Sequence, residues 1–492
     1  MAGIRPAFIT AFLSVGPAIA LGAAVVHQGN ASVVPECVQA CSHLANIFGP
    51  DAYSLGNANV TLWDAKQQET HSACWVQPSS TEDVATILGV IIDTSCRFAV
   101  KGGGHARNPD DSVSAGGVTI DMQKMRSVEV SPDQKTAKVG SGHVLLSLYE
   151  GLEKYNLTTL GGRVADVGLG GYVLGGGFSH LSPKYGLAMD NVFEYEIVLP
   201  NATVAIVNHE TQPDLYFALR GGMNNFGIVT HFTMRAARQG QMLGGVRTYT
   251  ADKRDAILEQ AYALTTSWKN DTNMAFFYSY GYDQEIDDFT LAVSQEYSLP
   301  ILSPAPFEQL NQIPFEHSTV RLDRTSRFSI ESASATPPGG RNLFATVTYL
   351  PSADLDKQIQ DIMAQEIQSL KKAPGFYPNL VIQPLYEAAI RSGKERGGNA
   401  AVALLTVLWE NADDDDQMNA FAQEWVKRST ATTEDAGKHH PWLYINYAST
   451  DQDPFLSYGE ANLQKLRRIQ REVDPQGIFT SDGLCRGYFK LQ

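Results

Sequence analysis

Three glycine-dense loops constrain this chain more than any other feature of its sequence. They span residues 102–105, 168–177 and 221–227. Glycine lacks a side chain, so such a loop can bring its backbone N–H groups close to anionic oxygens, as a pyrophosphate requires. One glycine loop is usually only a tight turn, but three of them together suggest a large phosphate-bearing cofactor.

The middle loop shares only its glycine spacing with the Rossmann dinucleotide fingerprint. Gly168, Gly170 and Gly171 are followed by Asp190 about twenty residues later. A Rossmann loop must open an amphipathic helix. Here the glycines at 175–177 interrupt any helix, so we expect turns and a cofactor fold of another kind.

The 492 residues exceed what one hydrophobic core usually organises, so two or three compact units are expected. Residues 79–82 form a capping-box pattern with apolar residues at helical spacing behind it, which predicts a helix from near Ser80. The apolar run 98–100 predicts a strand that ends in the first glycine loop.

From about residue 240 to 440, strand-like runs alternate with long helical patterns, which predicts an α+β domain. The strand-like runs are 276–280, 289–293, 343–350 and 401–409, and the helical patterns are 251–268, 354–372 and 417–428. The acidic run 413–416 is expected to complement a helix dipole rather than bind a metal ion. Aromatic residues between Phe276 and Tyr282 could line a pocket, although such residues on a strand more often form core.

The N-terminus has the features of a secretory signal peptide. Arg5 precedes an Ala-rich apolar stretch, so we expect cleavage after about residue 25 rather than a retained membrane anchor. Five N-x-S/T sequons agree with secretion: Asn30, which lies close to the expected cleavage point, and Asn59, Asn156, Asn201 and Asn270. A net charge of -15 disfavours nucleic acid as a partner.

Cysteine usage agrees with an oxidising compartment. Four cysteines, Cys37, Cys41, Cys74 and Cys96, lie in the first hundred residues, and Cys485 stands alone near the end. Two disulfides of open connectivity and one free thiol are expected. A zinc site is disfavoured because the spacings lack paired C-x-x-C units.

Taken in order, these markers resemble the vanillyl-alcohol oxidase superfamily, in its branch of berberine-bridge-enzyme-like and fungal secreted oxidases that includes solanapyrone-synthase-like enzymes. The matching segments are 78–84, 102–105, 175–177, 184–187, 190–192, 214–222, 225–227, 444–447 and 474–475. The resemblance implies an α+β chain with a bipartite PCMH-type FAD-binding domain, residues 35–240 (PCMH-type from about 70) and 441–492. Between them, residues 241–440 would form a substrate domain with an antiparallel sheet covered by helices.

The resemblance also implies that FAD is attached covalently through His105. A neutral imidazole nitrogen can add to the activated flavin methyl group. Alone, a histidine after three glycines would more often be a turn residue. The other cofactor contacts implied are Gly102, Gly103, Gly104, Asn108, Val164, Val167, Gly168, Gly175, Gly176, Ile228 and Asn446.

One position departs from many relatives, which attach the flavin a second time through a cysteine. Val164 stands where that cysteine would be. Attachment through His105 alone is therefore expected, which weakens a carbohydrate-oxidase assignment. Val167 aligns with a position where a small valine admits oxygen and a leucine obstructs it, which favours oxidase behaviour.

Tyr447 is the predicted catalytic base, or the group that orients the substrate hydroxyl. If residues 442–447 form a strand, Tyr447 and Tyr444 point to opposite faces. An unperturbed phenol has a pKa near ~10, so a base at neutral pH needs a stabilising cation or donors, and the sequence does not identify them. A tyrosine packed between domains is the alternative. Beyond this segment, apolar residues 463–473 predict a helix stopped by Pro475.

The leading hypothesis is a secreted oxidase that removes two electrons from a small organic molecule and passes them through FAD to dioxygen, giving hydrogen peroxide. A flavin-containing cyclase or isomerase without net redox change is the first rival. A binding protein that has lost its flavin is the second, which the intact loops and His105 do not support. Substrate identity and oligomeric state do not follow from the sequence, and no membrane partner is expected after signal cleavage.

Overall fold

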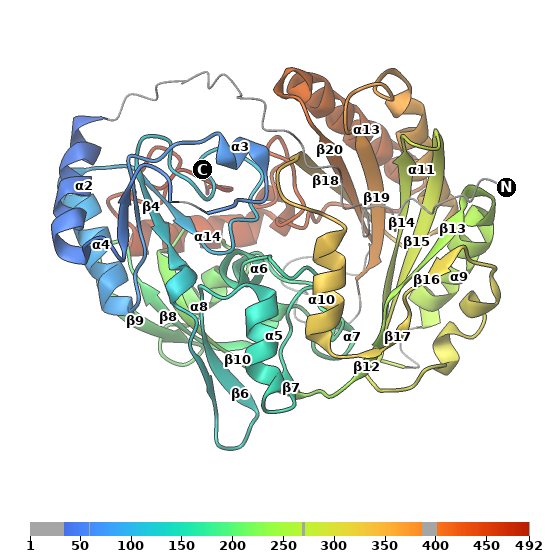
Figure 1. Cartoon of the computed structure of the whole chain (residues 1–492), viewed down its shortest axis with the longest axis horizontal. Helices are drawn as coiled ribbons and strands as arrows, with labels where there is room; N and C mark the ends of the chain where they lie inside the picture. The colour runs from blue at the N-terminus through green and yellow to red at the C-terminus, as the bar shows by residue number, and fades with distance from the viewer. Residues whose placement is uncertain (1–33, 59, 268–270, 386–400, 492) are drawn as a thin grey trace.

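The computed structural model describes residues 34–491 except 59, 268–270 and 386–400. Two lobes lie on either side of a central helix, α10 (Thr325–Ser334) (Figure 1). Within the described ranges, no helix has both the length and the apolar character needed to cross a bilayer. The predicted signal peptide and the sequons at Asn59 and Asn270 lie outside the described residues. Asn156 and Asn201 are exposed.

The first lobe begins with a four-stranded sheet covered by two helices. Its strands, in spatial order, are β1 (Tyr53–Leu55), β2 (Cys74–Val76), β4 (Val118–Asp121) and β3 (Phe98–Lys101). The covering helices are α2 (Pro35–Phe48) and α4 (Thr81–Thr94). The helix predicted from near Ser80 is confirmed. The Ser80 side chain accepts a hydrogen bond from the Asp83 N–H, and Asp83 closes the capping box.

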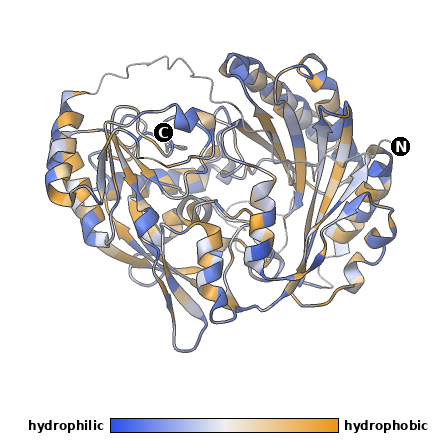
Figure 2. Ribbon diagram, viewed as in Figure 1, coloured by the Kyte–Doolittle hydropathy of each residue, from blue (hydrophilic) through white to orange (hydrophobic). Residues whose placement is uncertain are grey.

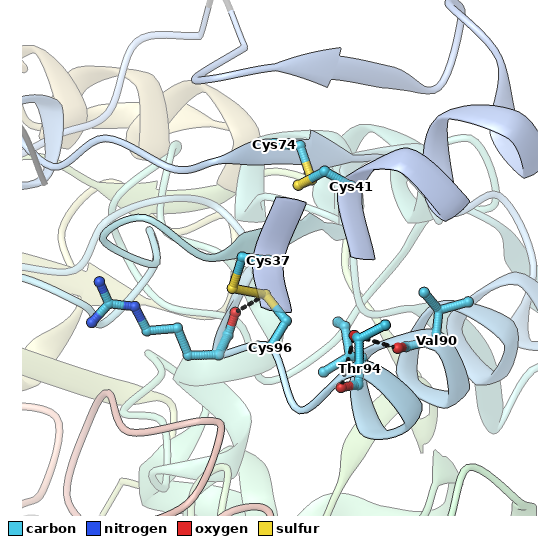
Figure 3. The surroundings of a disulfide bond; sticks show 8 residues. Cys37, Cys41, Cys74, Val90, Thr94 and Cys96 are labelled. Carbon is cyan, nitrogen blue, oxygen red and sulfur yellow. Dashed lines mark hydrogen bonds between the residues drawn. A yellow bond between two sulfur atoms is a disulfide. The ribbon is translucent and has the colours of Figure 1, made fainter. Parts of the chain in front are cut away.

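Two disulfides fasten α2 to this sheet (Figure 3). Cys37 pairs with Cys96, which lies just before β3, and Cys41 pairs with Cys74 on β2. Cys485 is a buried free thiol. The predicted two bridges and one free thiol are confirmed, and the structure supplies the connectivity that the spacing left open.

A five-stranded antiparallel sheet completes the first lobe. Its order is β5 (Val128–Val130), β6 (Thr136–Gly140), β10 (Ile228–Arg235), β8 (Val192–Val198) and β9 (Val204–Asn208). Two short strands of this lobe, β7 (Leu157–Thr158) and β11 (Ala237–Arg238), pair with each other. Its helices include α5 (Leu145–Glu153), α8 (Pro213–Leu219) and α14 (Glu460–Val473). Buried residues of 137–236 and 442–491 share one core, so the end of the chain packs into the first lobe (Figure 1). As predicted, α14 ends just before Asp474 and Pro475.

The second lobe is a ten-stranded sheet whose paired strands are antiparallel. Along the main path it runs β16 (His317–Ser318), β13 (Val246–Thr250), β15 (Asp288–Tyr297), β14 (Met274–Asp283), β19 (Tyr377–Pro384), β20 (Ala401–Trp409), β18 (Arg341–Tyr349) and β21 (His439–His440), with β12 (Met242–Gly244) and β17 (Arg321–Asp323) beside it. Helices α9 (Arg254–Ser267), α11 (Ala353–Glu366) and α13 (Asp415–Asp435) cover one face (Figure 1). The predicted α+β class is confirmed.

Strand alternation divides the aromatic residues of β14. Phe276, Tyr278, Tyr280 and Tyr282 are buried in the core between the sheet and its helices. Phe277 points to the other face and lines a cavity. Orange and blue residues interleave along the ribbons of both lobes (Figure 2), as expected for sheets that pack on one face. The core interpretation holds for four of these five aromatics.

Two local expectations are wrong. A helix, α6 (Leu169–Leu174), does form within the middle glycine loop, because Leu169, Val173 and Leu174 pack into the core and stabilise it. It ends at Gly175, where the glycines begin. The predicted strand at 442–447 is instead a turn, closed by a hydrogen bond of 2.8 Å from the Tyr447 N–H to the Tyr444 carbonyl.

Candidate active site

A cavity of about 690 Å³ lies between the two lobes. Its walls are loops of the first lobe, the 444–447 turn and the helix-free face of the ten-stranded sheet. It brings together most predicted site residues: Gly102, Gly103, Gly104, His105, Asn108, Val164, Val167, Gly168, Asn446 and Tyr447. Gly175, Gly176 and Ile228 do not line it, and their predicted contacts to a cofactor stay predictions.

Two glycines let the first and middle loops touch. A Cβ at Gly103 would stand 2.4 Å from the Gly168 backbone nitrogen, and a Cβ at Gly168 would stand 2.1 Å from the Gly103 nitrogen. Any side chain at either position would therefore push the loops apart. This contact places residues 163–168 beside His105.

The His105 imidazole is fixed by stacking. Its ring lies 4.0 Å from the Trp63 ring, with 13° between the planes. Burial lowers the pKa of His105 to about 3, so the imidazole is neutral near pH 7. Its Nε2 has no hydrogen-bond partner among the described residues. A neutral imidazole held in one orientation at a cavity wall fits a ring that forms a covalent bond to a cofactor.

The third part of the site is the 444–447 turn. The glycines at 175–177 contact this turn. The Tyr444 hydroxyl accepts hydrogen bonds from the Gly177 N–H at 2.9 Å and from Asn446 Nδ2 at 3.0 Å. A Cβ at Gly175 would lie 2.1 Å from Asn446 Oδ1. From the other side, the Arg107 guanidinium donates to the Asn446 and Ala448 carbonyls at 3.3 and 3.0 Å. The turn is thereby held at both sides.

Tyr447 meets the charged partner that the sequence did not reveal. Arg163 Nη2 donates to the Tyr447 hydroxyl at 3.1 Å, and that hydroxyl donates to Gln383 Oε1 at 3.3 Å. Arg163 Nη1 also donates to Gln383 Oε1 at 3.1 Å. The guanidinium stacks on Phe277, 4.1 Å from the ring centroid. The Tyr447 hydroxyl thus lies between a guanidinium and an amide oxygen, both of which reach it from outside its own turn.

The expectation that Tyr444 and Tyr447 lie on opposite faces is wrong. Their rings meet edge to face at 4.6 Å, and both line the cavity, because the segment is a turn rather than a strand. Their roles nevertheless differ. The Tyr444 hydroxyl contacts the Gly177 backbone and Asn446, whereas the Tyr447 hydroxyl contacts the guanidinium of Arg163.

Sequence reasoning missed Arg163, Gln383 and Trp63. Arg163 directly precedes Val164, the position where many relatives have a flavin-linked cysteine. The prediction for this segment concerned that cysteine alone. Gln383 lies on β19, where only three apolar residues, 380–382, stand between Pro378 and Pro384 and gave little strand signal. Trp63 precedes the short helix α3 (Ala65–Gln68), and nothing in the local pattern links it to His105.

Comparison with known proteins agrees with this geometry. A family model described as an FAD binding domain matches residues 72–208. The chain is 36% identical over 464 residues to the FAD-dependent monooxygenase tpcD of Cochliobolus heterostrophus, covering 89% of each chain. It is 27% identical to the bifunctional solanapyrone synthase of Alternaria solani, covering 94% of this chain and 90% of that protein.

The chain belongs to a family of FAD-linked oxidoreductases that includes fungal FAD-dependent monooxygenases. Among solved structures, 6-hydroxy-D-nicotine oxidase from Arthrobacter nicotinovorans superposes with a TM-score of 0.72 at 20% identity, covering 87% of this chain and 96% of that chain. Glucooligosaccharide oxidase from Acremonium strictum, described with a 6-S-cysteinyl, 8α-N1-histidyl FAD, gives 0.69 at 18% identity, covering 92% and 99%. These likenesses show that the fold is that of the family.

The residues of the cavity fit the FAD that the family binds. Gly103 and Gly168 bring the two loops into contact, and the neutral imidazole of His105 lines the cavity beside them. Val164 and Val167 add apolar surface beside them. The residues 102–105 and 163–168 would therefore hold the cofactor on the first-lobe wall.

Proposed function

We propose that this enzyme is a secreted oxidase that removes two electrons from a small organic substrate, with FAD held covalently by His105. The observation that carries the proposal is the Arg163–Tyr447 contact in the same cavity as His105. When bound, FAD accepts a hydride from the substrate and passes the electrons to dioxygen, which leaves as hydrogen peroxide. Two disulfides support a secretory route for the chain.

The residues of the chain supply binding, orientation and proton transfer. Tyr447, as the phenolate, takes the proton from the substrate hydroxyl as the hydride departs, and Arg163 Nη2 stabilises the negative charge of the phenolate beforehand. Gln383 Oε1 accepts hydrogen bonds from Arg163 and from the protonated Tyr447 hydroxyl, so it orients both side chains before Tyr447 loses its proton. The sheet face with Phe277 and Phe344 lines the cavity opposite the loops of the first lobe.

A screen of small alcohols and phenols, with peroxide measured as product, tests the proposal. The enzyme should release one peroxide for each substrate oxidised, and product oxygen should not come from isotopically labelled dioxygen. Substrate conversion without peroxide and without oxygen consumption would identify a cyclase or isomerase instead.

Incorporation of an oxygen atom is the second candidate, because the relative at 36% identity is called a monooxygenase. In that case the labelled atom appears in the product and peroxide falls below one per turnover. The same labelled-oxygen experiment therefore decides between the two redox reactions.

A further inference from the structure

Two buried polar atoms lie close together beside the cavity, one on His105, which lines it, and one on Asp166. His105 Nε2 and Asp166 Oδ1 are 3.6 Å apart, and neither has a hydrogen-bond partner among the described residues. Most buried polar atoms in folded proteins are paired, so an orphan needs an explanation. At 3.6 Å the two atoms fall just outside hydrogen-bond range, and a small rotation of the ring or the carboxylate closes the gap.

Asp166 is held in this place by its backbone rather than by its side chain. The neighbouring Ala165 N–H donates to the Ser329 carbonyl at 3.1 Å, and the Val167 carbonyl accepts from the Leu145 N–H at 3.0 Å. The Gly103–Gly168 contact fixes the distance between the two loops. The Asp166 side chain, at 44% exposure, also reaches solvent, whereas the His105 side chain is only 16% exposed.

We propose that Asp166 is a positioning residue for cofactor attachment: it keeps a proton on Nε2 of His105, so that Nδ1 presents its lone pair to the flavin methyl carbon. The second ring nitrogen of a histidine commonly sets which nitrogen reacts, through the group it contacts. This inference rests on the proposed covalent attachment through His105. Burial lowers the pKa of His105, so the ring is neutral and only one of its two nitrogens carries a proton.

The atoms and electrons of this step balance. One C–H bond of the flavin methyl group and the Nε2–H bond of His105 break, and one C–N bond forms at Nδ1. Asp166 accepts the Nε2 proton and releases it to water through its exposed side. The two electrons of the broken C–H bond enter the flavin ring and pass to dioxygen, which leaves with two protons as hydrogen peroxide.

Attachment can be followed without any substrate. Wild-type protein and its variants, purified from flavin-limited cells and mixed with FAD in aerated buffer, would be sampled over time, precipitated with acid and assayed for flavin in the pellet. Asp166→Asn should attach flavin about a hundredfold more slowly than wild type, the lower end of a general-base effect. Asp166→Glu should recover part of the rate.

Two further variants separate this role from a general loss of charge or of structure. Glu331→Gln removes a carboxylate from the same cavity that contacts Thr319 and Arg321 rather than His105, and it should attach flavin at the wild-type rate. Asp166→Ala should regain attachment when formate is added, which a structural defect would not. Quenching of FAD fluorescence checks that each variant still binds the cofactor.

The outcomes distinguish the role of Asp166 from covalent attachment through His105, on which that role depends. If wild-type flavin leaves the pellet freely, covalent attachment itself is wrong and the Asp166 role falls with it. If wild-type flavin stays and Asp166→Asn attaches it at the wild-type rate, or formate has no effect on Asp166→Ala, only the Asp166 role is overturned.

Discussion

The two walls of the cavity are built in different ways. The first-lobe wall consists of loops whose backbones touch, as at Gly103 and Gly168, and it offers N–H groups and one histidine. The second-lobe wall is the face of an antiparallel sheet. Residues of its strands, such as Phe277, Ser279 and Thr406, line the cavity there. A wall made of backbone tolerates almost no substitution, whereas a wall made of side chains can change its shape without changing the fold.

The difference suggests a division of labour. The loop wall suits a cofactor that is the same throughout the family, and the sheet wall suits substrates that vary between members. Arg163 and Tyr447 come from the first lobe and Gln383 from the second, so the proposed proton acceptor lies where the two walls meet. Each prediction below changes one wall and compares it with the other.

The largest effect is expected from His105→Ala on the loop wall, which should abolish covalent attachment completely because the reacting nitrogen is gone. His317→Ala, on the sheet wall of the same cavity, should leave attachment intact. Flavin absorbance of the acid-precipitated pellet measures both. Flavin retained in the pellet by His105→Ala would contradict the assignment of cofactor attachment to the loop wall.

Arg163→Met should slow flavin reduction by substrate about 10- to 100-fold, because a charge-assisted hydrogen bond contributes about 1.5–3 kcal/mol. Arg163→Lys keeps the charge but cannot donate from two nitrogens to Tyr447 and Gln383 at once, so an intermediate rate is expected. Anaerobic stopped-flow absorbance gives the rates. A wild-type rate in Arg163→Met would mean that the guanidinium serves packing on Phe277 only.

Val167→Leu should slow reoxidation of the reduced flavin several-fold by narrowing the path of dioxygen on the loop wall. Val381→Leu, a matched change on the sheet wall, should not. Reduced enzyme is mixed with aerated buffer and flavin absorbance is followed. Equal rates in all three proteins would remove Val167 from control of oxygen access.

The smallest effects concern stability, where one carboxyl group in each lobe contributes in a different pH range: Glu196 in the first and Asp356 in the second. Burial alone would raise the pKa of Glu196, but hydrogen bonds from Lys138 and Thr81 and the nearby His231 outweigh it and lower the pKa to about 2. Glu196 therefore stabilises the first lobe above about pH 4.5, and this contribution disappears as the pH falls toward 2. Glu196→Gln should lower Tm by a few degrees at pH 7 and by less at pH 3.

In the second lobe, burial raises the pKa of Asp356 to about 6, although the hydroxyls of Tyr278 and Tyr349 donate to it. Its favourable contribution is present below about pH 4 and is lost as the pH rises through 6. The Tm difference between Asp356→Asn and wild type should thus grow more positive from pH 4 to pH 8 in scanning calorimetry. A difference that does not change with pH would contradict the raised pKa.

Sequence patterns predicted the loop wall better than the sheet wall, for a physical reason. Gly103 and Gly168 are required by the contact between their loops, but the requirement shows in the residue type, so the sequence displays it. The helix at Thr81–Thr94 and the strand Ala401–Trp409 also followed from capping and apolar runs. A capping pattern and an apolar run can be recognised without knowing which residues lie on the opposite side of the cavity.

The contacts that complete the site join residues far apart in the chain. Arg163 and Tyr447 are separated by 284 positions, and Arg163 and Gln383 by 220. The turn at 444–447 also escaped prediction because its apolar and aromatic letters favour a strand, while Arg107 and the glycines at 175–177 hold it otherwise. Tertiary contacts overrode the local preference.

The rate of flavin reduction in Tyr447→Phe tests the central claim most directly. The ring remains to contact Phe178 and Tyr444, but the proton acceptor is lost. With a substrate identified through peroxide release, the anaerobic reduction rate should fall by about two orders of magnitude or more while FAD stays attached. A rate within a few-fold of wild type would contradict the account and move the proton acceptor elsewhere in the cavity.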